Sequence, residues 1–178
     1  MVDGLIPPQL KNIESIDLSV NSFTGFVSLQ VGVERLRYFY LSGNKLYGQI
    51  PFYFCHSDNV LMLLYLSNNN LEGTAPTSLR NYTFLIFLNV GGNKLNGEVP
   101  NELENEMNLS YLDLTDSHFE GPFPGFILQG LGVLKLGYNR FQGKIPIFIG
   151  DLQKLQILVL ESNFFNSIPQ EINKLEKL

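Results

Sequence analysis

The stretch LRYFYLSGNKLYGQIP, from Leu36 to Pro51, decides the fold because the chain repeats it. The skeleton L-x-x-L-x-L-x-x-N-x-L-x-G-x-I-P returns as LIFLNVGGNKLNGEVP at Leu85–Pro100 and as LGVLKLGYNRFQGKIP at Leu131–Pro146. A repeat that covers most of the chain at a nearly constant period predicts a stack of similar structural units. The asparagine position recurs in steps of 22 to 25 residues, at Asn21, Asn44, Asn69, Asn93, Ser117, Asn139 and Asn163.

Each repeat opens with a short alternating segment. In Tyr38–Ser42, Phe39 and Leu41 fall on one side, and the two tyrosines and the serine fall on the other. This pattern predicts a strand with one buried face, and such strands form a parallel sheet along the concave side of a leucine-rich repeat solenoid. The return segments are short and rich in proline and glycine, which favours 3-10 or irregular turns on the convex side. We therefore predict one β-rich α/β solenoid over residues 1–178, with about seven full repeats.

The repeated asparagine lies where the chain turns away from the strand. Its amide both donates and accepts hydrogen bonds, so it can satisfy backbone groups that the turn leaves unpaired. We expect a weak rung at Ser117, where Thr115 and Asp116 could compensate. Gly48 of the quoted repeat permits a backbone conformation that a Cβ atom disfavours. The expected ladder of buried hydrogen bonds comprises Asn21, Asn44, Asn69, Asn93, Asn139 and Asn163.

Composition argues against several classes of protein. The chain has 12 basic and 17 acidic residues, a formal net charge of −5, and none of the basic stripes that a nucleic-acid partner requires. Its longest apolar stretches, Val60–Leu66 and Phe84–Leu88, are far shorter than the roughly 20 residues of a membrane-spanning helix. No signal peptide follows Met1. The single cysteine, Cys55, cannot form an intramolecular disulfide and is interpreted as a small buried apolar residue.

Both ends of the sequence match parts of repeats. Gly4–Pro7 resembles the G-x-I-P tail of a repeat, and Leu175 and Leu178 begin an eighth one. A solenoid covers its terminal core faces with polar caps, and neither end carries such a cap. We therefore expect partial repeats at both ends of a fragment of a longer array. One exposed apolar edge is expected at Leu5, Ile6 and Leu10, and another at Leu175 and Leu178.

The L-x-G-x-I-P endings at Leu46–Pro51, Leu71–Pro76, Leu95–Pro100 and Phe141–Pro146 resemble the plant-specific class of leucine-rich repeats. The stretch IPFYFCHSDNVLMLLYLSNNNLEGTAP from Ile50, and LQILVLESNFFNSIPQEINKLEKL near the C-terminus, are similar to receptor-like proteins and receptor-like kinases of plant immunity. The resemblance implies a right-handed superhelix with an additional sheet of short strands on its flank. It also implies an extracellular setting.

The resemblance implies recognition and not catalysis. The leading hypothesis is the ligand-binding region of a plant cell-surface receptor in defence or development, on the extracellular side of the plasma membrane. Its expected partners are a peptide, glycan or protein ligand on the concave face and a co-receptor kinase. The alternative is a secreted inhibitor of the polygalacturonase-inhibiting type in the cell wall. The sequence contains no kinase motif, and we expect neither enzymatic activity nor a cofactor.

Candidate ligand contacts lie on the solvent side of the predicted concave strands. Aromatic side chains offer large contact areas at little entropic cost, so they commonly anchor ligands. Strands also favour tyrosine and phenylalanine for reasons unrelated to binding, and this alternative has equal weight. The candidate residues are Tyr38, Tyr40, Tyr65, Phe87, Tyr111, Asp113, Lys135 and Tyr138.

Two other patterns bear on chemistry. Asn81–Thr83 and Asn108–Ser110 are sequons, which predict N-glycans on Asn81 and Asn108 if the chain is secreted. The acidic residues and histidine of Asp113–Glu120 lie close together in sequence, but alternation places them on different sides of a strand and a turn. We therefore expect a solvated polar rim there and no metal site.

Overall fold

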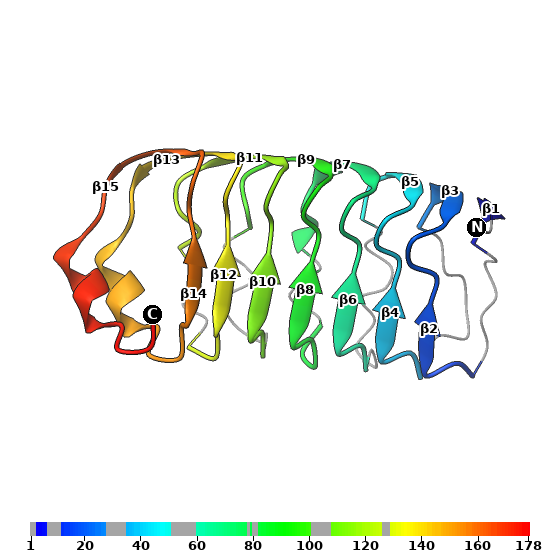
Figure 1. The fold of residues 1–178 in the computed structure, drawn as a ribbon, viewed down its shortest axis with the longest axis horizontal. Coiled ribbons are helices and arrows are strands. Elements are labelled where there is room, and N and C mark those ends of the chain that lie inside the picture. The colour runs from blue at the N-terminus through cyan, green and yellow to red at the C-terminus, as the bar shows by residue number, and fades with distance from the viewer. Residues whose placement is uncertain are drawn as a thin grey trace.

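In a computed structural model, the chain forms a solenoid built from two parallel sheets, with two 3-10 helices among the described residues (Figure 1). The structure describes residues 3–6, 12–27, 35–50, 60–77, 79, 82–100, 108–125 and 129–178. Each repeat contributes one strand to each sheet, so consecutive strands of one sheet are separated by a whole repeat. The predicted parallel-strand solenoid is confirmed.

The seven-stranded sheet, here called the front sheet, faces the viewer in Figure 1. Every strand has three residues and pairs in parallel with the strand of the next repeat. The middle residue of a front strand points into the core, as Phe39 and Leu64 do. The strands are β2 (Ser15–Asp17), β4 (Tyr38–Tyr40), β6 (Leu63–Tyr65), β8 (Phe87–Asn89), β10 (Tyr111–Asp113), β12 (Val133–Lys135) and β14 (Ile157–Val159).

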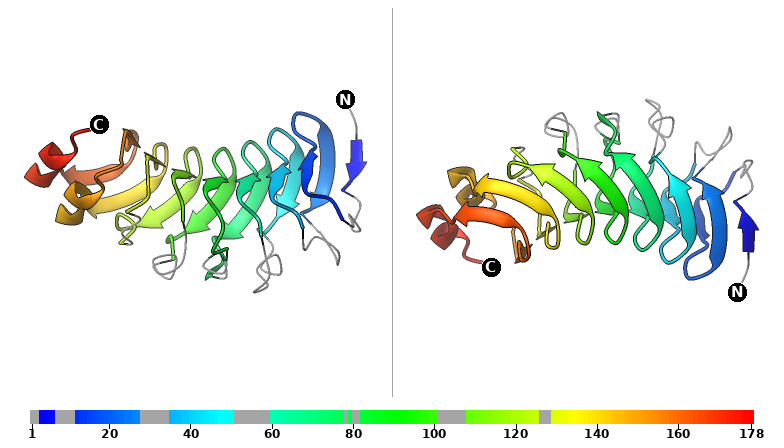
Figure 2. Two further views of the ribbon diagram at one scale, coloured as in Figure 1. Left: turned by 90° about the horizontal axis from the view of Figure 1, so that it is seen from below. Right: turned by 90° about the horizontal axis from the view of Figure 1, so that it is seen from above.

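The eight-stranded sheet, here called the flank sheet, runs along the upper margin of Figure 1 and can be followed in both views of Figure 2. It matches the additional sheet that the family resemblance implied. Its strands are β1 (Asp3–Leu5), β3 (Ser22–Phe26), β5 (Lys45–Gly48), β7 (Asn70–Thr74), β9 (Lys94–Gly97), β11 (His118–Gly121), β13 (Arg140–Lys144) and β15 (Phe164–Ser167).

The repeat glycine sits in the left-handed backbone region that the sequence predicted. Gly48 has a φ of 82° and Gly143 has the same value, a conformation that a Cβ atom disfavours. The last repeat lacks this glycine and is one residue shorter between Asn163 and its proline. There the pairing of β13 with β15 shifts register after Gly143. The sequence irregularity therefore appears as a local irregularity of the flank sheet.

A second left-handed position precedes the ladder asparagine in every repeat. The non-glycine residues there include Val20 and Tyr138, with φ of 53° and 54°. Each such residue costs roughly 1–2 kcal/mol relative to a right-handed conformation. The amide at this position donates to a carbonyl of the next repeat, as Asn68 N does to Gly91 O at 2.8 Å. The turn geometry of the stack thus overrides the preference of the individual residue.

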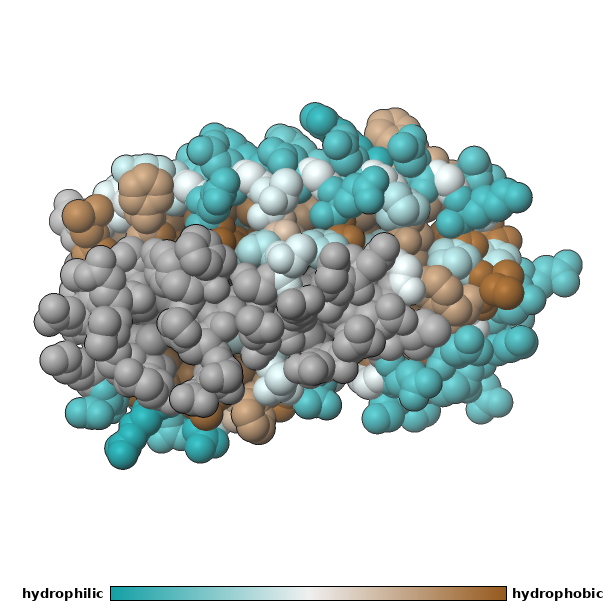
Figure 3. Space-filling view, turned by 180° about the vertical axis from the view of Figure 1, so that it is seen from behind, coloured by the Kyte–Doolittle hydropathy of each residue, from teal (hydrophilic) through white to brown (hydrophobic). Residues whose placement is uncertain are grey.

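The return side contains short 3-10 helices, as predicted. They are η4 (Ile147–Asp151) and η5 (Gln170–Lys174). Leu5 and Leu178 are exposed, as expected of an apolar edge, whereas the expectation for Ile6 and Leu175 is wrong because both are buried. Leu10 lies outside the described residues. Seen from behind, hydrophilic side chains predominate among the described residues along the upper and lower margins (Figure 3).

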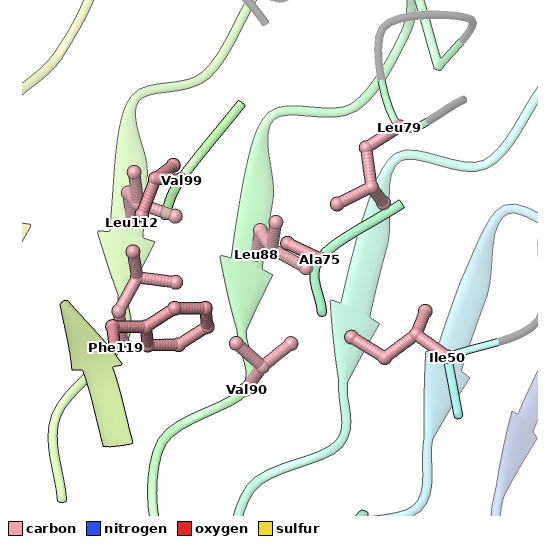
Figure 4. A pocket seen from close by; sticks show the side chains of 9 residues that line it. Ile50, Ala75, Leu79, Leu88, Val90, Val99, Leu112 and Phe119 are labelled. Atoms are coloured by element: carbon pink, nitrogen blue, oxygen red, sulfur yellow. The ribbon is translucent and has the colours of Figure 1, made fainter. Parts of the chain in front are cut away.

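A small apolar cavity of about 10 Å³ lies inside the core of the second to fifth repeats. Figure 4 shows the surrounding side chains, among them Ile50, Ala75 and Val99. These three residues occupy the isoleucine position of G-x-I-P, and the alanine is the smallest of them. A void with an apolar lining does not hold water favourably, so its walls simply lose packing contacts.

We expect Ala75→Val to stabilise the protein by about 1 kcal/mol, because it places two methyl groups against this void. The melting temperature should rise by about 2–4 °C in a thermal unfolding measurement. Thr74→Val is the control, since Thr74 is exposed and gains no buried contact. A lower melting temperature for Ala75→Val alone means that the core has no room for the added methyls.

Candidate ligand-binding face

The outward side chains of the front sheet form two rows because parallel strands pair in register. Residues at the same position of successive strands become neighbours. The first row contains Tyr38, Leu63, Phe87, Tyr111 and Val133. The second row contains Tyr40, Tyr65, Asn89, Asp113 and Lys135.

Four aromatic rings stack across these rows, and we call them the aromatic ladder: Tyr40, Tyr65, Phe87 and Tyr111. The ring centroids of Tyr40 and Tyr65 are 4.9 Å apart, those of Tyr65 and Phe87 are 4.3 Å apart, and those of Phe87 and Tyr111 are 3.8 Å apart. The interplanar angles fall from 32° to 18° to 9° along the series. The ladder therefore runs continuously over four strands, from β4 to β10.

Stacking determines which part of each ring is exposed to solvent. All four rings are partly buried, because each ring in the ladder covers a face of its neighbour. Because the stacked faces of Tyr65, Phe87 and Tyr111 cover one another, a partner would meet the edges of these rings. Burial raises the pKa of Tyr65 above its ordinary value, and the phenols of Tyr40 and Tyr111 raise it further. Tyr65 therefore stays neutral throughout the physiological pH range.

A polar cluster, here called the polar terminus, ends the ladder at β10 and β12. It consists of Tyr111, Asp113, Thr115 and Lys135. Oδ1 of Asp113 accepts from the Thr115 amide at 3.0 Å and from its hydroxyl at 2.6 Å. Oδ2 accepts from the Tyr111 hydroxyl at 3.2 Å and lies 3.6 Å from Lys135 Nζ. Asp113 was predicted to face solvent, and this prediction is wrong. The residue is only 7% exposed because these partners cover it.

Lys135 is the single cation among the outward residues of the front-sheet strands. Its Nζ lies 5.4 Å from the ring centroid of Tyr111, a cation–π contact. The hydrogen bond with the Tyr111 hydroxyl raises the pKa of Lys135 above its ordinary value, and the charge of Asp113 raises it further against the opposing effect of burial. The ammonium is therefore charged and held at the end of the ladder.

Tyr138 does not lie on a strand, contrary to the sequence prediction. It occupies the left-handed turn position between β12 and Asn139 and is 53% exposed. Together with Lys135, Val159 and Glu161 it borders an open hollow beside the polar terminus. Tyr138 is thus near the predicted face, although it is not part of the aromatic ladder.

On the five strands from β4 to β12, sequence reasoning missed three outward residues: Leu63, Asn89 and Val133. They occupy the same alternating positions as the predicted set, so aligning the repeats position by position would have identified them. Asn89 also accepts a hydrogen bond from the Gly91 amide at 3.1 Å. This bond from a side-chain oxygen to the amide two residues later forms a turn, and the carboxylates of Asp17 and Asp113 form the same turn.

The repeated asparagines, here called the asparagine ladder, make a recurring set of hydrogen bonds between repeats. Asn93 Nδ2 donates to Leu66 O at 3.0 Å and to Val90 O at 2.8 Å, and its Oδ1 accepts from Leu71 N at 3.0 Å. Asn44, Asn69, Asn139 and Asn163 bond in the same way to their own and the preceding repeat. Asn21 donates to Leu18 O and Ser19 O. Contrary to the prediction of a buried ladder, Asn21 and Asn163 are only partly buried, because they lie near the two ends of the stack.

Ser117 interrupts this pattern. It is buried, and its hydroxyl has no hydrogen-bond partner among the described residues. Thr115 does not compensate, because its hydroxyl bonds to Asp113. The backbone of Ser117 is nevertheless regular: its amide donates to Tyr138 O at 3.2 Å, as the Asn139 amide does to Ser162 O.

The other predicted features lie away from the front sheet or outside the described residues. Asn108 is exposed just before β10, and its Nδ2 donates to Thr83 O at 2.8 Å. Asn81 and Cys55 lie outside the described residues. Where the structure is described, no group of three or more histidine, cysteine or acidic side chains could hold a metal ion. Likewise, no helix within the described ranges is long and apolar enough to cross a membrane.

Comparison with known proteins gives consistent relatives. A family model described as Leucine Rich Repeat matches residues 35–57, 60–82 and 84–105. Receptor-like protein 32 of Arabidopsis thaliana is 31% identical over 175 residues, which cover 93% of this chain and 20% of that protein. Receptor-like protein EIX2 of Solanum lycopersicum is 48% identical over 163 residues, covering 90% and 16%. The chain thus spans a fifth or less of these two relatives.

Several solved structures with the same fold are plant receptor ectodomains. The GASSHO1/SCHENGEN3 ectodomain of Arabidopsis thaliana, in complex with CASPARIAN STRIP INTEGRITY FACTOR 2, is 31% identical with a TM-score of 0.84 over 99% of this chain and 25% of that one. The Arabidopsis receptor kinase HAESA, in complex with the peptide hormone IDA and the co-receptor SERK1, is 29% identical with a TM-score of 0.77. That alignment covers 98% of this chain and 34% of the other.

Proposed function

The chain is a leucine-rich repeat protein homologous to a stretch of the plant receptor-like proteins, and we propose that it forms part of the ligand-binding surface of a cell-surface receptor. The aromatic ladder carries this proposal. It places four rings on one face of a rigid sheet, where aromatic side chains are effective anchors for a partner. The proposed role is binding and not catalysis.

The stacked geometry favours a polypeptide ligand over a glycan. A sugar ring packs against the flat face of an aromatic ring, but in the ladder these faces cover one another. Ring edges carry partial positive charge, so they attract peptide carbonyl oxygens and the faces of aromatic or other flat side chains. Strands are about 4.8 Å apart, so the distance from β4 to β12 is about 19 Å, or about six residues of extended peptide.

The setting proposed for this surface is extracellular, within a longer receptor at the plasma membrane. HAESA is in complex with a peptide hormone and a co-receptor, and we extend both partner types to the parent of this chain. Asn108 is the proposed glycan site among the described residues, because it is exposed beside the front sheet. Asn81 is proposed on its sequon alone.

The test is a selection of binders from a phage-displayed library of random 12-residue peptides on the folded chain. We expect Phe87→Ala to weaken binding of the selected peptides at least about tenfold in calorimetric titration. The reason is that Phe87 is the central ring, stacked on both Tyr65 and Tyr111, so its removal splits the ladder.

Tyr47→Ala is the matched control. Tyr47 is an aromatic residue of the flank sheet, 47% exposed and packed edge-on against Phe26. A loss of peptide binding with Tyr47→Ala and none with Phe87→Ala would move the site to the flank sheet and refute the proposal. Chitohexaose and cellohexaose form the glycan arm, and Phe87-dependent binding of either one contradicts the polypeptide assignment while leaving the site in place.

A further inference from the structure

Asp113 differs from the other buried polar side chains of the described residues because it carries a charge. The others are asparagines of the hydrogen-bonded ladder and Ser117. Burying a carboxylate is costly unless each oxygen is satisfied, and here each oxygen has two partners. The two oxygens serve different groups: Oδ1 faces Thr115, and Oδ2 faces Tyr111 and Lys135.

We propose that Asp113 is a positioning residue, which holds Tyr111 and Lys135 in place so that the end of the aromatic ladder is organised before a ligand arrives. This inference rests on the function proposed above. Because four donor groups from Thr115, Tyr111 and Lys135 occupy the carboxylate, we expect Asp113 to act on the ligand indirectly. It acts through Lys135, the one cation among the outward residues of the front-sheet strands, and through Tyr111, the last ring of the aromatic ladder.

The Oδ1 contacts are a feature of the turn and not of the polar terminus. Asn89 accepts the equivalent amide hydrogen bond one repeat earlier with a neutral side chain. An amide is therefore sufficient for the turn. Only a carboxylate can accept at its second atom from Tyr111 and pair with Lys135, because the amide group of asparagine is a donor there. Asp113→Asn consequently separates the two roles.

The experiment compares wild type with Asp113→Asn in the full chain by NMR, without a ligand. We expect an unchanged fold, a lower pKa of the Lys135 ammonium in a pH titration, and altered ring-current shifts of Tyr111 as its stacking on Phe87 loosens. Asn89→Asp is the matched control, because it adds a carboxylate at the same turn position of β8. It should leave the pKa of Lys135 unchanged, since Lys135 lies two strands away.

Binding completes the test. Peptides selected on the wild-type chain should bind Asp113→Asn about tenfold more weakly, the scale of one lost hydrogen bond to a charged group. If Lys135 and Tyr111 keep their wild-type NMR signatures, or if affinity is unchanged despite altered signatures, the positioning role is overturned. The proposed function is tested separately by Phe87→Ala. If that variant also leaves peptide binding unaffected, the proposed function itself fails. If Asp113→Asn does not fold, a Lys135→Met variant with wild-type Tyr111 shifts and wild-type affinity overturns the proposal instead.

Discussion

Replacing Asn93 by alanine is expected to destabilise the protein by about 3–5 kcal/mol. The substitution removes the acceptor for the buried Leu71 amide and the donor to Leu66 O and Val90 O. A buried backbone group left without a partner costs about 1–3 kcal/mol, and Asn93 serves groups in two adjacent repeats. Its loss therefore acts on the interface that holds the stack together.

A urea titration followed by circular dichroism measures this effect as a change in the free energy of unfolding. Asn96→Ala is the control, because Asn96 lies three residues later on β9 with an exposed side chain. It should change the free energy of unfolding by less than about 0.5 kcal/mol. Equal losses in the two variants would show that the asparagine ladder has no special share in stability.

Replacing Ser117 by asparagine is expected to stabilise the protein by about 2 kcal/mol, since it completes the interrupted ladder. The Ser117 backbone already has the hydrogen bond that the ladder asparagines make at this point, so the new side chain enters a regular site. Val90 O, Leu114 O and the Leu95 amide hold the positions that bond to asparagine in the other repeats. The melting temperature should rise by several degrees.

Ser117→Ala provides the comparison for this variant. Its hydroxyl makes no hydrogen bond within the described residues, so removing it should have little effect on stability. A strong destabilisation by Ser117→Ala would show that the hydroxyl has a partner after all. A Ser117→Asn protein no more stable than wild type would show that this rung does not limit the stability of the array.

The solenoid could be predicted from the sequence because its determinants are local and periodic. Alternation in Tyr38–Ser42 gives one buried face, and repetition of the pattern places equivalent strands side by side. The positive φ of Gly48 and the placement of Tyr40 and Tyr65 on one face of the sheet follow from the same periodicity. The interruption at Ser117 was likewise visible as one departure from seven aligned positions.

Only the tertiary structure decided how the repeats meet. The stacking of Phe87 between Tyr65 and Tyr111 crosses from one row to the other, which depends on side-chain rotamers and neighbouring repeats and not on spacing. The sequence predicts that Asp113 is a solvent-facing strand residue. In the structure Lys135, 22 positions later, lies beside it. Tyr138 was likewise predicted to lie on a strand, but it occupies a turn between repeats and has a left-handed conformation. Local pattern therefore determined the fold and the outward positions of the sheet, and contacts between repeats determined which of those side chains are exposed.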